Sequence, residues 1–133
     1  MKVMVDTNVI ISALLFPASL PARILLHTTG NHVLVLCDHI VTEIRDVVSR
    51  KRPDLLGDVD MLLAQLSYEL VIAPNEPSKC IQDPKDQPIL NAALMAGVDV
   101  IVSGDKHFLK LALERPKTMS PVEFWQSEQG QCM

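Results

Sequence analysis

The stretch VMVDTNVIISALL, residues 3–15, sets the fold, because a short apolar run ends at an aspartate and a helical segment follows at once. Lys2 to Val5 is apolar and rich in valine, which predicts a strand. The continuous apolar run HVLVLC, residues 32–37, predicts a second strand that is buried on both faces. Three more strands are expected at residues 70–73, 99–102 and 117–119.

Helical segments alternate with these strands. They are expected at residues 8–15, 18–28 (closed by Gly30), 38–50 (with Asp38 as N-cap), 58–67, 86–96, 107–113 and 121–126. This alternation predicts an α/β fold with a parallel sheet covered by helices on both faces. The length suits one domain over residues 1–126, with residues 127–133 as a flexible C-terminal tail.

Composition narrows the class of protein. Hydrophobic residues make up 48% of the chain and charged residues 21%, which excludes a disordered chain. The three cysteines have no CxxC spacing, which disfavours a disulfide framework or a zinc site and suits reduced thiols in the cytoplasm. We expect no signal peptide and no membrane span. The net charge of −4 argues against a protein that coats nucleic acid.

Four carboxylates are predicted to meet at the edge of the sheet where the parallel strands end. Asp6 directly follows the first strand, and Asp105 lies just past the fourth. Asp86 opens the helix that leads into the fourth strand, and Glu43 lies in the second turn of the helix that leaves the second strand. Sites in parallel sheets form outside this edge, so the topology places all four acids in one candidate site.

A cluster of carboxylates calls for a cation. Like charges brought together raise one another's pKa and destabilise the fold, and a divalent ion removes that penalty. Ligands that are all oxygen suit Mg²⁺ or Mn²⁺ better than Zn²⁺, and one or two ions would fit. Glu43 lies on the margin of an apolar helical stripe that includes Ile40 and Val47, so its carboxylate faces partly inward.

Each acid also has a structural explanation. Asp83 lies in the same loop as Asp86 and is the alternative ligand. Asp6 could be a turn residue after its strand. Asp86 and Asp105 could serve only as helix caps. Glu43 could be a surface residue paired with Arg45, which is the strongest of these alternatives.

The chain resembles the PIN domain family. The segments that carry the resemblance are VMVDTNVIISALL (3–15), TEIRDVV (42–48), DPKDQPILNAALMAGVDVIVSGDKHFLKL (83–111) and SPVEFW (120–125). The nearest subgroup is the one described as toxin components of toxin–antitoxin systems. The resemblance implies a three-layer α/β/α Rossmann-like fold with a central parallel sheet. It also implies cleavage of single-stranded RNA by metal-activated water, with a 5′-phosphate and a 3′-hydroxyl as products, and an antitoxin protein as a partner.

The resemblance assigns roles to individual residues. Asp6, Glu43, Asp86 and Asp105 match the acidic site of the family, where they would bind metal and act in catalysis. Thr7, Asn8 and Ser103 match positions of polar support, with Ser103 in place of the more usual threonine. Gln87 departs from the family, because many relatives carry a further aspartate there.

RNA could approach along two groups of basic residues, unless these are ordinary solvated faces. They are Arg45, Arg50, Lys51 and Arg52 in one group, and Lys106, Lys110, Arg115 and Lys117 in the other. Apolar residues after the first strand could form either a homodimer face or core, namely Leu14, Leu15, Phe16, Leu25 and Leu26.

Two other functions compete with the ribonuclease. The first is an inert module that keeps the fold and binds protein partners. The second is a phosphatase of the haloacid dehalogenase type, which would need a second aspartate where Asn8 stands.

Overall fold

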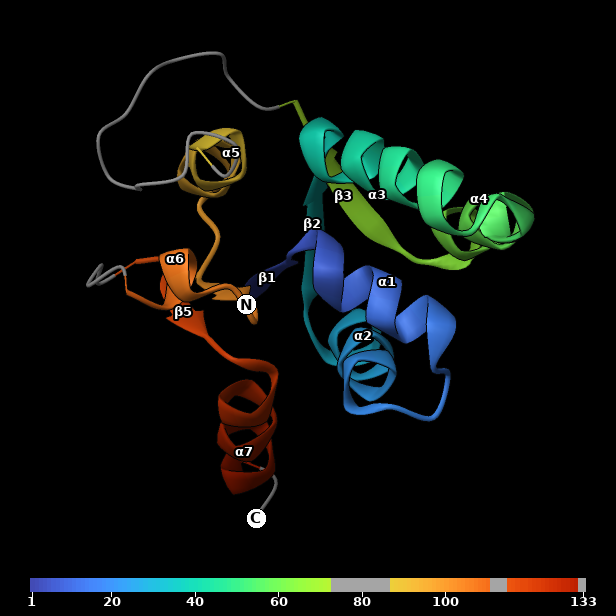
Figure 1. Ribbon diagram of the computed structural model, residues 1–133. Coiled ribbons are helices and arrows are strands. Elements are labelled where there is room, and N and C mark those ends of the chain that lie inside the picture. The colour runs from blue at the N-terminus through green and yellow to red at the C-terminus, as the bar shows by residue number, and fades with distance from the viewer. Residues whose placement is uncertain (73–86, 111–114, 132–133) are drawn as a thin grey trace.

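The computed structural model describes residues 1–72, 87–110 and 115–131. Strands and helices alternate along the chain (Figure 1). The strands are β1 (Lys2–Val5), β2 (Val33–Cys37), β3 (Tyr68–Val71), β4 (Val100–Val102) and β5 (Lys117–Met119). The helices are α1 (Thr7–Leu15), α2 (Leu20–Asn31), α3 (Asp38–Lys51), α4 (Leu56–Gln65), α5 (Gln87–Ala96), α6 (Lys106–Leu109) and α7 (Pro121–Gln131), with a 3-10 turn at Pro53–Leu55. Each predicted strand is present.

The strands form one parallel sheet in the order β3-β2-β1-β4-β5. Strand β1 lies in the middle, and the chain order reverses there. Clefts for ligands form outside the carboxyl ends of the strands at such reversals. The register pairs Val5 of β1 with Val102 of β4, so Asp6 and Ser103 leave the sheet side by side at one edge.

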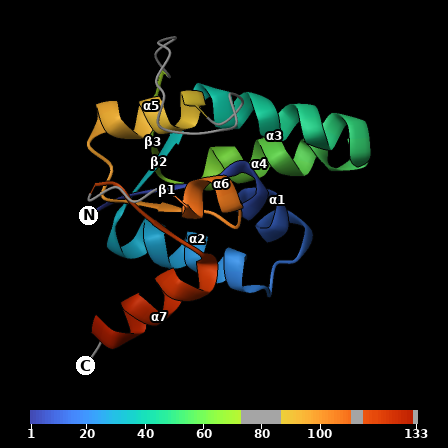
Figure 2. The ribbon, with the colours of Figure 1, turned by 60° about the vertical axis from the view of Figure 1, so that its left-hand side comes forward.

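Helices cover both faces of the sheet, which confirms the predicted α/β architecture. Figure 2 shows α3 and α5 together on one side of the sheet, and α2 with α7 on the other. Helix α1 contacts both α2 and α3. This arrangement brings α3 and α1 to the same end of the molecule as the carboxyl edge of β1.

The core is aliphatic and is built around the central strands. Val3, Met4 and Val5 of β1 are fully buried, and so are Leu36 and Cys37 of β2. The residues of β4 are buried as well, as expected of strands covered on both faces. Burial of each large aliphatic side chain contributes about 1.5–3 kcal/mol relative to exposure. The core therefore fixes the edge from which the candidate site projects.

Two of the predicted helix caps lie elsewhere in the structure. Gly30 was expected to close the second helix, but α2 continues to Asn31, and the N–H of His32 donates to the carbonyl of Thr28 at 2.8 Å. Asp38 was predicted as an N-cap, but Cys37 holds the cap position and Asp38 is the first residue of α3. An acidic residue in the first turn stabilises a helix by interacting with the helix dipole. Asp38 therefore still favours the start of α3, one position later than predicted.

The C-terminal segment is helical further than expected. A single turn was predicted to end at Gln126, followed by a tail, but α7 runs from Pro121 to Gln131. The Phe124 side chain is fully buried, and Glu128 is 4% exposed. Helix α7 contacts α2, and this packing orders residues that local sequence would leave frayed.

Among the described residues, no single helix has the length and apolar character to cross a membrane. Helices α1 and α2 meet that test only as a pair, and they are bent by 110° at the break between them.

Replacing Gly97 with alanine is expected to destabilise the protein. Gly97 has a φ of 69° at the end of α5, and a side chain in this left-handed region costs about 1–2 kcal/mol. Gly57 in α4 is the matched control, because nothing lies within 4 Å of the position that a Cβ would take. Gly57→Ala should stabilise the fold by about 0.4–1 kcal/mol through lost freedom of the unfolded chain. Urea denaturation measures the free energy of unfolding of both variants. Equal stability of the two would contradict a left-handed backbone at Gly97.

Candidate metal centre at the carboxyl edge of the sheet

Asp6 is the centre of the candidate site. It follows β1 with extended backbone angles and is the N-cap of α1, where its Oδ1 accepts a hydrogen bond from the N–H of Val9 at 3.0 Å. Its own N–H donates to the carbonyl of Val102 at 3.1 Å. The side chain is only 5% exposed, so the carboxylate is held in one orientation by the strand before it and the helix after it.

Ser103 links Asp6 to Asp105. Its hydroxyl donates a hydrogen bond to Oδ2 of Asp6 and accepts one from the N–H of Asp105 at 2.9 Å. Ser103 is fully buried directly after β4, and Asp105 is half-buried. The parallel pairing of β1 with β4 places these residues together, as the sequence predicted from the strand ends.

Glu43 approaches the same site from α3. It lies on the margin of the buried stripe formed by Ile40 and Ile44, and a third of its side chain (33%) is exposed. His39, one turn earlier, has Nε2 3.8 Å from Oε2 of Glu43, which is too long for a hydrogen bond. The Nε2 atom is buried without a hydrogen-bond partner. Sequence reasoning did not single out His39, because one histidine beside an acid carries no spacing signal.

The electrostatics of Asp6 identify this edge as a site of concentrated negative charge. Burial is the main cause that raises the pKa of Asp6 above its ordinary value of 3.8. Hydrogen bonds from Ser103 and Val9 lower the pKa of Asp6, and the charges of Asp105 and Glu43 raise it again. Asp105 and Glu43 therefore both lie within electrostatic reach of Asp6.

This arrangement fits a divalent cation. Each carboxylate oxygen of Asp6 accepts one hydrogen bond. A carboxylate oxygen has a second lone pair, which remains available for a ligand. A cation would relieve both the burial of the Asp6 charge and its repulsion by Asp105 and Glu43. A donor set made only of oxygen atoms is the kind that Mg²⁺ and Mn²⁺ prefer.

The other predicted site residues have different outcomes. Asp86 and the alternative Asp83 lie outside the described residues, as does the Gln87 side chain. Thr7 is buried, and its Oγ1 has no hydrogen-bond partner. Asn8 is exposed in the first turn of α1. Ser103 makes the hydrogen bonds that a supporting role requires, and that role remains a prediction for Ser103, Thr7 and Asn8 alike.

The first basic group is largely neutralised by neighbouring acids. Arg45 pairs with Asp60, Arg50 with Asp46 at 3.0 Å, and Arg52 with Asp54 at 3.0 Å. All six side chains are more than half exposed. These arginines form a solvated surface with matched charges, which gives little support to an RNA track along α3.

A second cluster escaped sequence reasoning. Among the described residues, one group of three metal-binding side chains has all its ligand atoms within 4.8 Å of one another, and it consists of His27, His32 and Glu128. It lies between α2 and α7. Asp6, Glu43 and Asp105 are spaced more widely than this.

Comparison with known proteins identifies the family. A model of the PIN domain matches residues 2–107, which is most of the chain. The chain therefore belongs to the PIN domain family. It is also 33% identical over 116 residues to the uncharacterized protein MJ1680 of Methanocaldococcus jannaschii, a match that covers 83% of this chain and 74% of that protein.

Two solved structures share the fold. One is VapBC2 from Rickettsia felis bound to a DNA fragment from its promoter, with a TM-score of 0.69, 17% identity, and coverage of 90% of this chain and 98% of that one. The other is DNA-bound VapBC from Salmonella typhimurium, with a TM-score of 0.68, 16% identity, and coverage of 91% and 98%. At these identities the likeness establishes the α/β fold and nothing more.

The raised pKa of Asp6 predicts a pH dependence of stability. A carboxyl group whose pKa is higher in the folded than in the unfolded protein binds more protons when folded, so its contribution to the free energy of unfolding falls as pH rises from 3.8 through the folded pKa. Without metal, wild type should therefore lose stability relative to Asp6→Asn across this window. Urea denaturation in EDTA from pH 4 to 7 measures the difference. Parallel pH curves for the two proteins would refute the prediction, and saturating Mg²⁺ should reduce the difference.

Proposed function

We propose that this PIN domain is a metal-dependent ribonuclease that cleaves single-stranded RNA, and that it acts in the cytoplasm as the toxin of a toxin–antitoxin pair. The observation that carries the proposal is the buried Asp6 carboxylate, held by Val9 and Ser103 beside the charges of Asp105 and Glu43. Helix capping accounts for the position of Asp6, but the fold gains nothing from the charges of Asp105 and Glu43 near this buried carboxylate. A cation site does gain from them.

The described residues orient one carboxylate of the proposed site. The Ser103 hydroxyl donates to the Asp6 carboxylate and accepts from the backbone N–H of Asp105, so these two residues are held next to each other at the edge of β1 and β4. A third (33%) of the Glu43 side chain is exposed. The chain thus offers one anchored carboxylate, Asp6, with Asp105 beside it and Glu43 partly open to solvent.

Asp6, Asp105 and Glu43 would hold one or two Mg²⁺ or Mn²⁺ ions, with Asp86 as the fourth proposed ligand. A bound ion supplies a Lewis acid that lowers the pKa of water and offsets the charge that develops on the phosphodiester. Substrate binding has few other aids, since the net charge is −4 and aromatic residues make up 4% of the chain. Affinity for RNA should therefore be weak and sensitive to salt.

Cleavage of an end-labelled single-stranded RNA tests the proposal. Wild type should cut with Mn²⁺ or Mg²⁺, stop in EDTA, and leave products with a 5′-phosphate and a 3′-hydroxyl. A product with a 2′,3′-cyclic phosphate would contradict the mechanism. Absence of cleavage, together with no stabilisation by either metal, would contradict the whole proposal.

An inert binding module is the second candidate, and the ion pairs on α3 favour it. They remove the positive charge that would guide RNA to the site. Leu15, Phe16 and Leu26 are exposed, whereas Leu25 belongs to the core, so the exposed three remain a candidate homodimer face. Likeness to the VapBC chains supports a protein partner for either function.

A further inference from the structure

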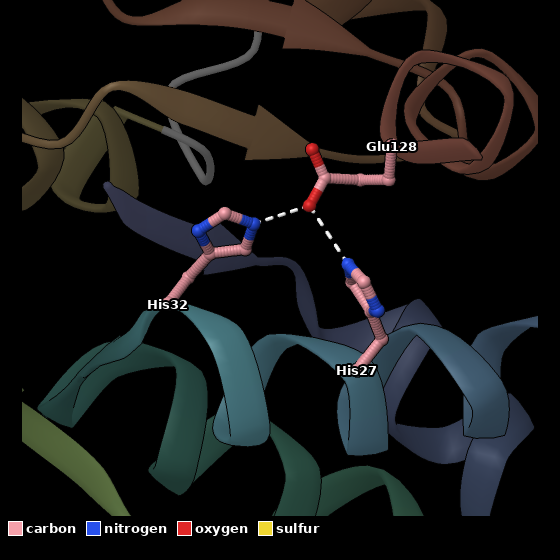
Figure 3. Close-up of side chains that lie close together, drawn as sticks. All are labelled: His27, His32 and Glu128. Carbon is pink, nitrogen blue, oxygen red and sulfur yellow. Dashed lines mark hydrogen bonds and ion pairs between the residues drawn. The ribbon is translucent and has the colours of Figure 1, made fainter. Parts of the chain in front are cut away.

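Two histidines and a glutamate meet between the second and the last helix, far from the carboxylate site. His27 lies in α2, His32 is the C-cap of α2, and Glu128 comes from α7 (Figure 3). The Nε2 atoms of both rings point at the same carboxylate oxygen, Oε1 of Glu128, with His27 at 2.8 Å. Nearly a hundred residues separate the two sides of this cluster, so the fold itself creates it.

The carboxylate of Glu128 is buried but only half satisfied. Its side chain is 4% exposed, and its second oxygen, Oε2, is buried without a hydrogen-bond partner. A buried carboxylate oxygen without a partner is costly, so the two histidines alone do not fully satisfy Glu128. His27 and His32 are 22% and 13% exposed, which leaves a path from solvent to the ring nitrogens.

We propose that His27, His32 and Glu128 form a transition-metal site, suited to Zn²⁺, that fastens α7 to α2. Two imidazole nitrogens and one carboxylate are an established ligand set for zinc, with water in the fourth position. Imidazole ligands separate this site from the carboxylate centre, whose oxygen ligands suit Mg²⁺ or Mn²⁺. This ligand set needs no cysteine, so the absence of CxxC spacing in the sequence does not speak against it.

The geometry requires only small side-chain movements. Zinc lies about 2.0–2.1 Å from nitrogen or carboxylate oxygen, so tetrahedral ligands are about 3.4 Å apart. The ligand atoms here all lie within 4.8 Å of one another. Both histidine nitrogens lie closer to Oε1 than the spacing between two ligands of one zinc ion, so they would have to move apart when the ion binds. Insertion of the ion between them would exchange two hydrogen bonds for three metal bonds.

The outer ring nitrogens have polar neighbours. Nδ1 of His27 lies 3.3 Å from the side-chain amide of Asn31, and Nδ1 of His32 lies 3.4 Å from the amino group of Met1. A metal-binding histidine donates its second ring N–H to an acceptor, which the Asn31 amide can provide for His27. The Met1 ammonium is a donor only, so it would have to move aside for His32 to bind metal through Nε2. In the metal-bound form Nδ1 of His27 carries the proton, so the Asn31 amide would have to turn its oxygen toward the ring and give up the hydrogen bond that it now donates to the His27 carbonyl at 2.9 Å.

The test is titration of untagged protein with Zn²⁺ by calorimetry in an Asp6→Asn background, which weakens the carboxylate site. We expect one Zn²⁺ per chain, and at least a tenfold loss of affinity in His27→Gln, His32→Gln and Glu128→Gln. Glutamine keeps an N–H donor for Glu128, so the histidine variants preserve a hydrogen-bonded contact and remove the zinc ligand. His39→Gln is the matched control and should bind Zn²⁺ as tightly as its parent.

Co²⁺ provides a second measurement that needs no variant. The only tryptophan of the chain, Trp125, lies 5.7 Å from His27 between ring centroids. With excess Mg²⁺ present to occupy the carboxylate site, Co²⁺ should quench the Trp125 fluorescence and develop visible absorption at one equivalent. Zn²⁺ should reverse both signals.

Two results would overturn the proposal. One is Zn²⁺ affinity that is unchanged in both histidine variants. The other is wild-type protein whose Trp125 fluorescence and visible spectrum do not respond to Co²⁺, which would show that the cluster is a metal-free clamp of hydrogen bonds. The second measurement decides the matter if the variants do not fold. Neither result depends on RNA cleavage, so the zinc site and the ribonuclease function are tested independently.

Discussion

Asp6→Asn is expected to reduce RNA cleavage by roughly 100-fold to 1,000-fold, because several kcal/mol of charge stabilisation by the metal depends on this carboxylate. Asp6 is the most buried of the three described acids, and the other two act on its pKa. An asparagine keeps the shape and removes the charge. The measurement is the rate of cleavage of a labelled single-stranded RNA at a fixed concentration of Mn²⁺.

The fold should survive this change. Asparagine is as good an N-cap as aspartate, so the bond from the N–H of Val9 is retained. Loss of the buried charge also removes the repulsion by Asp105 and Glu43. Without metal, the melting temperature of Asp6→Asn should therefore equal or exceed that of wild type, while the rise produced by Mg²⁺ should disappear.

Asp46→Asn is the matched control for this experiment. Asp46 lies on α3 and is exposed and paired with Arg50, so the same chemical change there should leave cleavage within twofold of wild type. Equal loss in both variants would indicate a general effect of charge rather than a metal site. Full activity of Asp6→Asn would show that Asp6 does not belong to the metal centre and would indicate a contaminating nuclease.

The sheet and the placement of Asp6 and Asp105 could be predicted because strong local patterns determine them. Uninterrupted apolar runs identify buried strands, and the rule that sites form at carboxyl edges then places Asp6 and Asp105 together. The link through Ser103 follows from the parallel register of Val5 with Val102. Glu43 was predictable from its position beside the buried stripe of α3.

What could not be predicted depends on packing between distant segments. Helix α7 has a weak apolar pattern, and its contacts with α2 and β5 explain why Phe124 is buried and why the helix continues to Gln131. The pairing of His27 with Glu128 spans 101 positions, so no spacing rule could find it. The pairing of Arg45 with Asp60 likewise needs α3 and α4 to be packed together.

Ser103→Ala is expected to reduce cleavage by about 10–100-fold, the usual effect of losing a group that orients a metal ligand. The Ser103 hydroxyl binds both the Asp6 carboxylate and the backbone of Asp105. Without it, a buried oxygen of Asp6 loses its donor. That hydrogen bond lowers the pKa of Asp6, so its removal should raise the pKa further.

The pH profile of cleavage distinguishes this role from a general loss of stability. If activity requires the ionised Asp6, the acidic limb of the profile should move to higher pH in Ser103→Ala, which unfolding alone would not produce. Ser103→Thr keeps the hydroxyl and should restore most of the rate. Ser49→Ala is the control, because Ser49 donates only to a backbone carbonyl on the exposed face of α3. An unshifted profile in Ser103→Ala would show that the hydroxyl does not lower the pKa of Asp6. A threonine variant as slow as the alanine variant would show that the hydroxyl does not orient the Asp6 carboxylate.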